Sequence, residues 1–411
     1  MTTAEGIDGR FRRLWAAQAV SQLGDRITEL ALPLIAVDLL AADADQVGLL
    51  NAAVWLPYLG SVLAGGWVDR QRHKRRVMVA ADLARMIVLL SLPIGYWLDL
   101  LSLAQLFAVA LLNGLGEVFF NTAVPTVFVS LVPRSAYLRA NSRLSGTRAL
   151  SYIVGPALGG PLIQVLTAPV AVLVDAVSFA GSAILLARLR LTGIPAEKTM
   201  DDESETPWWR SLSAGARFIA GDRTLRACLA CATTVNLFGL IASTLIVLYA
   251  RRTLDLSPGL IGLAFGIGAV GGLLGAALTP RLARRIGIGR TAMVGSVLFP
   301  IAYAVPVFAS GVTPVKVIVL GSAEFLGAIG VMLFDVSLNS LQTSLIPDHL
   351  RSRVAGAFST VNYGVRPVGA VAGGLLGTAF GLRPTLLVAA IGGVLSVFWL
   401  FFSPVRLIRE L

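Results

Sequence analysis

Charged residues, histidines and cysteines are scarce in this chain. Only 14% of its 411 residues are charged, 56% are hydrophobic, and the mean hydropathy is +0.78. Soluble domains carry about 25% charged and about 45–50% apolar residues, so the composition excludes an ordinary soluble protein and indicates a membrane protein. The two histidines, His73 and His349, fall between apolar runs, so no histidine inside a membrane span can bind a metal ion or carry a proton.

Two motifs that often accompany cofactor chemistry carry no such meaning here. Cys228-Leu229-Ala230-Cys231 is a CxxC sequence inside an apolar run, without the thioredoxin-like context that would make it a redox site. Gly266, Gly268 and Gly271 fit the dinucleotide fingerprint, but that fingerprint needs a preceding strand. We therefore expect structural cysteines and helix packing, no cofactor, no metal site and no enzymatic activity.

The net charge of +11 does not indicate a nucleic-acid partner, because the basic residues fall in short clusters between apolar runs. A bilayer core of about 30 Å requires about 20 apolar residues in a helix. The sequence therefore predicts an all-α membrane protein with twelve transmembrane helices. We place these spans near 14–38, 47–68, 77–98, 102–130, 141–166, 170–188, 226–250, 258–280, 291–311, 314–344, 354–379 and 383–403.

Orientation follows from the Lys and Arg residues, because basic loops stay cytoplasmic. With both termini inside, 26 of the 34 basic residues lie on the cytoplasmic side. We therefore expect a multi-pass protein of the cytoplasmic membrane, with its first span retained rather than cleaved as a signal peptide. The basic residues left inside predicted spans are Arg26, Arg85, Arg148 and Arg366.

The chain divides into two halves around a polar segment. We predict six-helix bundles over 1–190 and 226–411, joined by a cytoplasmic linker over 191–225. Residues 208–221 are amphipathic, which favours either a helix at the membrane surface or an ordinary ordered linker. Residues 114–160 resemble residues 328–374 at an offset of 214 positions, so the two halves look like copies of one another. Many transporters place a substrate cavity between such halves and expose it to alternate sides.

A loop motif follows the second span. Gly65, Asp69, Arg70 and Lys74 match G-x-x-x-D-R-x-G-R-K, with Arg72 in place of the second glycine. By this motif the chain resembles the major facilitator superfamily, and the resemblance implies two pseudo-symmetric six-helix bundles. In that family the motif holds the cytoplasmic gate in one state. The simpler alternative is a basic cluster that only sets orientation.

The fifth span carries Gly155, Pro156, Gly159 and Gly160, which resemble the antiporter motif G-x-x-x-G-P-x-x-G-G with Ser151 in the first position. Together with Gly24-Asp25 in the first span, this is similar to the branch that holds macrolide, tetracycline and siderophore exporters driven by protons. Small-residue packing alone is the alternative. The arginine that many such antiporters carry in the fourth span is absent, so its proton-relay role does not transfer.

Acids inside membrane spans are costly and mark candidate functional sites. Asp25 and Glu29 are four residues apart and share a helix face. Two carboxylates in a low dielectric resist being ionised together, which is the chemistry that proton exchange requires. The alternative for Asp25 is an ordering salt bridge with Arg85, Arg148 or Arg366. The sequence leaves the partner of Arg26 open.

Further candidates for the proton-coupling and substrate sites are Glu117, Glu324, Asp335 and Arg366. Asp82 and Asp175 lie near span ends and are interpreted as structural or gating residues. We predict a monomeric, proton-driven exporter of amphipathic small molecules such as drugs, antibiotics, siderophores or secondary metabolites. The alternatives are an importer or facilitator of the same fold, or a membrane scaffold or sensor that transports nothing.

Overall fold

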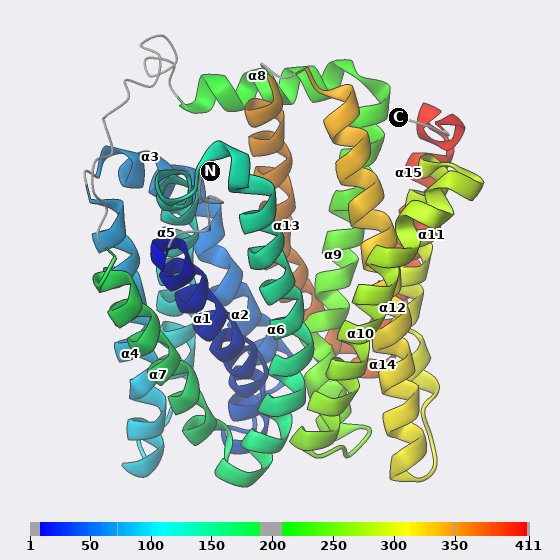
Figure 1. Ribbon diagram of the computed structural model, residues 1–411. Helices are drawn as coiled ribbons and strands as arrows, with labels where there is room; N and C mark the ends of the chain where they lie inside the picture. Colours follow the sequence, from blue (N-terminus) through cyan, green and yellow to red (C-terminus); the bar gives the residue numbers. More distant parts are fainter. Residues whose placement is uncertain (1–8, 72, 190–207, 348–349, 409–411) are drawn as a thin grey trace. The chain divides into compact units, whose positions relative to one another are not determined.

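The computed structural model describes residues 9–71, 73–189, 208–347 and 350–408. All regular structure in these ranges is helical, with no strand. The chain groups into two compact units, the first drawn from residues 1–41 and 53–204 and the second from 42–52 and 205–411. Each unit is a bundle of long helices and is described here by itself (Figure 1).

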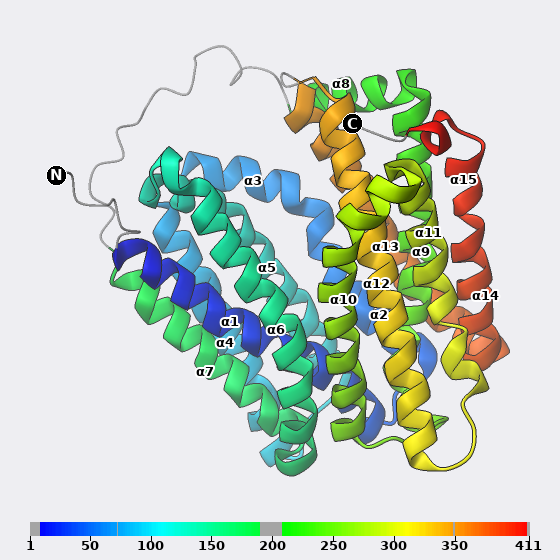
Figure 2. The ribbon, with the colours of Figure 1, turned by 45° about the vertical axis from the view of Figure 1, so that its right-hand side comes forward.

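The first unit is organised around helix α1 (Gly9–Leu34), which continues into a π-helical turn, Ile35–Leu39. Its other helices are α3 (Ser61–Arg70), α4 (Lys74–Trp97), α5 (Leu103–Leu131), α6 (Tyr137–Leu166) and α7 (Ala168–Ala187). Helix α1 packs along α7 on one side and α6 on the other, while α4 packs against α7 and α5 (Figure 2). Three helices of this unit, α1, α4 and α7, therefore share one interior.

In the second unit α9 takes the place that α1 has in the first. Helix α9 packs against α13 and α14, and α12 packs against α10 and α11. The helices are α8 (Trp208–Gly221), α9 (Arg223–Arg252), α10 (Pro258–Ile286), α11 (Ile288–Ala302), α12 (Thr313–Leu345), α13 (Arg351–Phe380), α14 (Leu382–Leu395) and α15 (Val397–Phe401). Figure 1 shows α8 crossing the ends of α9 and α13.

Helix α2 (Ala44–Trp55) belongs mostly to the second unit, although the predicted N-terminal bundle runs unbroken over 1–190. Gly48 lies against the backbone of Gly374 in α13, where a Cβ on either glycine would collide with the other helix. The Asp45 amide donates to the Thr378 hydroxyl over 3.0 Å. These contacts place residues 42–52 with the second unit.

Glycines bring α10 and α12 into close contact. A Cβ on Gly268 would lie 2.8 Å from the Glu324 Cβ, and one on Gly275 would lie 2.9 Å from the Ile329 Cα. The glycine pattern that fits the dinucleotide fingerprint is therefore a helix-packing surface, as the sequence predicts. Cys228 and Cys231 are free thiols buried in the core of the same unit.

Each predicted span coincides with a helix or a run of helical segments. Within the described ranges, nine helices are long and apolar enough to cross a membrane. The predicted first span is not among these nine helices, because α1 carries the charged residues Asp25, Arg26 and Glu29. The second is interrupted by a 3-10 segment, Leu56–Gly60, and the eleventh, in α13, contains Arg366 among many glycines and polar residues. Many large apolar side chains are exposed along these helices, which suits a multi-pass membrane protein.

Candidate functional site

An arginine and two aspartates meet inside the first unit. Arg85 of α4 donates from Nη2 to Oδ1 of Asp25 in α1 over 2.5 Å, and its side chain is only 3% exposed. Its Nε donates to Oδ1 of Asn113 in α5 over 3.0 Å. The guanidinium carbon also lies 4.0 Å from the centre of the Phe179 ring. Arg85 is thus held by three other helices of the unit.

The second carboxylate, Asp175 of α7, is completely buried. The Thr28 hydroxyl donates to its Oδ2, and the Ser178 hydroxyl donates to Oδ1 over 3.0 Å. Gly24 leaves room for this arrangement, because a Cβ there would overlap the Asp175 carboxylate and the Ser178 hydroxyl. Asp175 lies within electrostatic range of both Asp25 and Arg85. Asp25, Arg85 and Asp175 thus form a charged trio in which one guanidinium faces two carboxylates.

A third acid, Asp82, lies one turn before Arg85 on α4 and is also fully buried. The Ser182 hydroxyl of α7 is close to it, yet neither carboxylate oxygen makes a hydrogen bond of ordinary geometry with any described residue. Buried carboxylates without such partners are destabilising. The acids predicted to be structural or gating residues, Asp82 and Asp175, therefore lie beside the Asp25–Arg85 pair.

Arg26 finds its partners within α1 and on α6. Its guanidinium forms an ion pair with Glu29 and lies 4.2 Å from the centre of the Tyr152 ring. The Glu29 side chain is 59% exposed. Glu117 of α5 lies within electrostatic range of Arg26 and Glu29 and accepts a 3.5 Å hydrogen bond from Asn121. The two acids predicted to share a face thus have different partners, Arg85 for Asp25 and Arg26 for Glu29.

The antiporter-like motif packs directly against this part of α1. A Cβ on Gly155 would overlap the Cβ and Cγ of Arg26, whereas one on Gly159 would lie 3.4 Å from the Ile27 Cα. Pro156 lies inside α6, and Gly160 is buried. The motif therefore supports the position of Arg26 next to the acids.

The gate-like motif makes looser contacts in the described part of the chain. A Cβ on Gly65 would meet only the Thr122 methyl group at 3.8 Å, so close helix approach does not require glycine there. Lys74 Nζ donates to the Thr126 hydroxyl on α5 over 3.4 Å. Arg70 is exposed at the end of α3, and the Asp69 side chain lies outside the described part of the structure.

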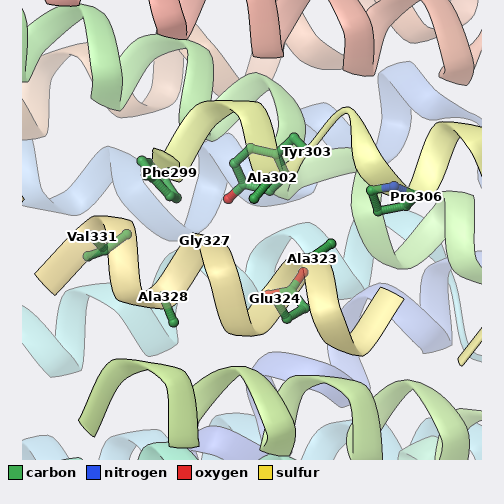
Figure 3. A pocket seen from close by; sticks show the side chains of 9 residues that line it. All are labelled: Phe299, Ala302, Tyr303, Pro306, Ala323, Glu324, Gly327, Ala328 and Val331. Carbon is green, nitrogen blue, oxygen red and sulfur yellow. The ribbon is translucent and has the colours of Figure 1, made fainter. Parts of the chain in front are cut away.

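The other candidates lie in the second unit. Glu324 of α12 lines a pocket with Phe299 and Tyr303 (Figure 3). Asp335, farther along α12 toward its C-terminal end, is within electrostatic range of Arg366 on α13. The Arg366 guanidinium lies 4.8 Å from the centre of the Tyr363 ring. Glu324 and the Asp335–Arg366 pair are therefore two separate features of this unit.

Of the three arginines considered for Asp25, Arg85 is its observed partner, while Arg148 is exposed on α6. Sequence reasoning missed Asn113, Thr28 and Ser178. Their polar side chains within apolar helices were the available signal, but the helix packing that brings them together cannot be read from spacing. Among the described residues, no group of three or more His, Cys, Asp and Glu side chains could hold a metal ion.

Comparison with known proteins finds efflux proteins among the relatives of this chain. The chain is 27% identical to the multidrug efflux pump Tap of Mycolicibacterium fortuitum over 392 residues, which covers 91% of this chain and 92% of the relative. It is 25% identical to macrolide efflux protein A of Streptococcus pyogenes over 187 residues, 44% of this chain and 45% of that protein.

Solved structures show the same fold at low identity. A bacterial homologue of the iron transporter ferroportin in an inward-facing state matches with a TM-score of 0.77 and 17% identity, covering 95% of this chain and 98% of the other. The nucleoside transporter NupG matches with a TM-score of 0.77 and 14% identity, covering 96% and 98%. The sequence model of the Major Facilitator Superfamily matches residues 14–370. The chain is therefore a member of the Major Facilitator Superfamily.

Proposed function

We propose that this transporter exports amphipathic small molecules and draws its energy from protons that bind at Asp25. The observation that carries the proposal is the ion pair between the buried Arg85 and the partly buried Asp25, with the second carboxylate of Asp175 nearby. Charges inside membrane helices are costly and are usually kept for function. The efflux pumps among the relatives support the direction of transport.

The trio suggests how a proton can be coupled to helix packing. When Asp25 takes up a proton, it loses its charge and its attraction for Arg85 weakens. The guanidinium charge is then balanced by Asp175, which is anchored to Thr28 and Ser178. Because the three charged groups belong to α1, α4 and α7, a change of ion pair alters how these helices are held together.

In the proposed cycle the proton enters from the outside as substrate leaves, and it is released inward before the next substrate binds. Glu29 and Glu117 extend the acidic surface beyond Asp25, and Glu29 is the more exposed of the two. They offer a path by which protons reach the buried pair. The substrate class, amphipathic drugs and antibiotics such as macrolides, is proposed from the similarity to the efflux proteins.

The proposal is tested in inside-out vesicles with an imposed pH gradient, using erythromycin and tetracycline as probes. We expect gradient-driven uptake by wild type and its loss in Asp25→Asn. The matched control is Asp99→Asn in the exposed turn before α5, a position with φ of 55° that asparagine tolerates. Uptake that survives equally in Asp25→Asn, Glu29→Gln and Glu117→Gln would contradict the proton-site assignment.

Vesicles of both orientations separate the competing functions. An importer or facilitator of this fold would move the probes into right-side-out vesicles, or down their own gradient without any response to pH. A membrane scaffold or sensor would move none of the probes in either orientation. Either outcome would overturn the proposed exporter.

A further inference from the structure

A pocket lies wholly inside the second unit, between the end of α11, the following 3-10 segment and α12 (Figure 3). Its volume is about 170 Å³. It is lined by Phe299, Ala302, Tyr303, Pro306, Ala323, Glu324, Gly327, Ala328 and Val331. Glu324 is the one ionisable carboxyl group among these residues, and the aliphatic and aromatic side chains make the remainder of the lining mostly apolar.

In the described part of the chain, Glu324 has no basic neighbour to neutralise it. Among the described residues its carboxylate forms no ion pair, and no Lys or Arg lies within electrostatic range of it. Its Cβ is fixed against Gly268 of α10, so the side chain is anchored at its base while the carboxylate borders the pocket. An acid in apolar surroundings is unfavourable unless a positive charge or a proton compensates it.

Two aromatic rings complete the site. Phe299 and Tyr303 form an edge-to-face pair with ring centres 5.5 Å apart and planes at 66°, and both line the pocket beside Glu324. Aromatic faces attract ammonium groups, most strongly where water is excluded. A metal ion would need several oxygen ligands, whereas the pocket supplies a single carboxylate. The combination of one acid and two rings is therefore suited to an organic cation.

The pocket volume limits what it can hold. An apolar cavity of about 150 Å³ accommodates a molecule the size of benzene, whereas sites for whole drug-sized ligands occupy about 300–1,000 Å³. At about 170 Å³, the pocket takes one substituted ammonium group or one ring with its amine. A larger molecule would place only its positively charged end there.

We propose that this pocket binds the ammonium head of organic cations through Glu324, Phe299 and Tyr303, and that it gives the transporter a preference for positively charged amphipathic substrates. The inference rests on the proposed transport function for its physiological meaning, but binding itself can be measured without a proton gradient. The equivalent positions in the first unit, 214 residues earlier, are the buried Ala110 for Glu324 and the buried Leu89 for Tyr303. The acidic and aromatic groups of the pocket therefore belong to one half alone.

Calorimetric titration of the purified full-length protein tests the proposal with two probes of nearly the same shape. The cation is 3-hydroxyphenyltrimethylammonium, and the neutral probe is 3-tert-butylphenol, in which carbon replaces the charged nitrogen. We expect the wild type to bind the cation at least about tenfold more tightly than the neutral probe, because the Glu324 carboxylate and the two aromatic rings attract its positive charge. Equal affinity for the two probes, or no binding of the cation, would overturn the proposal.

Variants locate the binding site. Glu324→Gln keeps the shape of the side chain and should weaken cation binding about tenfold or more while leaving the weak affinity for the neutral probe unchanged. Tyr303→Leu removes one ring and should weaken cation binding less. Thermal unfolding of each variant confirms that it is folded, and the wild-type comparison of probes stands even if a variant is not. Wild-type cation affinity in Glu324→Gln would contradict the assignment.

This outcome is independent of the proton site. If the wild-type protein shows no gradient-driven transport of the probes, the proposed function is refuted, but cation binding at Glu324 is unaffected. Loss of cation binding with transport preserved would refute the pocket assignment alone.

Discussion

The two units share the same contacts between corresponding helices, but the side chains at the positions of Asp25 and Arg85 are charged in the first unit and uncharged at the corresponding positions of the second. In the first unit Arg85 of α4 pairs with Asp25 of α1. The positions 214 residues later are Phe299 of α11 and Gly239 of α9, and there the aromatic ring lies so close to the glycine that a Cβ would be 3.2 Å from it. A buried ion pair in one half thus corresponds to an apolar ring contact in the other.

The same correspondence extends to the surrounding helices. Gly116 faces the Arg85 side chain, and its counterpart Gly330 faces the Phe299 backbone. Gly155 packs on Arg26 of α1, and its counterpart Gly369 packs on Leu237 and Leu240 of α9. Because the second unit forms these helix contacts without an ion pair at the corresponding positions, the fold itself does not need the Asp25–Arg85 pair. We attribute the charges of the first unit to function for this reason.

The largest expected effect comes from breaking the pair with the residue of the other unit. Arg85→Phe leaves Asp25 and Asp175 without a cation and should lower the free energy of unfolding by about 3–5 kcal/mol. The double variant Asp25→Gly/Arg85→Phe recreates the contact of the second unit and should recover part of that loss. Thermal and denaturant unfolding in detergent measure both changes.

Transport measurements on these two variants separate a loss of stability from a loss of function. Asp25→Gly/Arg85→Phe should fold better than Arg85→Phe and still show no gradient-driven uptake. If the double variant transports as well as wild type, the ion pair is structural and the comparison between the units has no functional meaning.

A smaller effect is expected at the antiporter-like motif. Gly155→Ala forces a methyl group into the Arg26 side chain. We expect this overpacking to lower the free energy of unfolding by about 1–3 kcal/mol and to impair transport. Gly159→Ala is the matched control, because its Cβ would make only tight contacts at 3.4 Å with Ile27. Unfolding curves that are the same for the two variants would show that the close approach of α6 to Arg26 is unimportant.

Asp82 offers a test in the opposite direction. Its counterpart at the 214-residue offset is Ser296, and the counterpart of its neighbour Ser182 is Ser396. Asp82→Ser removes a buried carboxylate whose oxygens lack ordinary hydrogen bonds, so it should raise the free energy of unfolding by about 1–3 kcal/mol. Lower stability in a denaturant titration would mean that Asp82 has a stabilising partner in the folded protein.

The smallest effect on stability is expected for Glu29→Gln. The Glu29 side chain is largely exposed and pairs with Arg26 one turn away on the same helix. Such pairs contribute about 0–1 kcal/mol, so the unfolding midpoint should barely move. A change as large as that of Arg85→Phe would show that Glu29, rather than Asp25, holds the first unit together.

The sequence predicted the helical framework well because apolar runs of membrane length are a strong local signal. It also predicted Asp25, Glu29 and Glu117 to be acids inside membrane spans, from their position in such runs. It did not predict which partners these acids have. Asp25 meets Arg85 and lies near Asp175 because α1 packs against α7 and α4 packs against α7, and these contacts are set by side chains far apart in the chain.

Arg26 shows the opposite case. Its partner Glu29 is three residues away, so the pair could have been predicted from helical spacing alone, whereas Tyr152 could not. The Glu324 pocket was likewise outside sequence reasoning, because it depends on where the end of α11 lies beside α12. Local signals thus gave the charged residues, and tertiary packing decided what each one contacts.

The central claim is that protons are exchanged at Asp25, and proton movement itself is the most direct measurement. Purified protein is reconstituted in vesicles that contain a pH-sensitive dye, and erythromycin or tetracycline is added to one side without an imposed pH gradient. We predict that the wild type moves protons in the direction opposite to the substrate and that Asp25→Asn moves none, while Asp99→Asn behaves as the wild type does. Substrate-driven proton movement at the wild-type rate in Asp25→Asn would contradict the account.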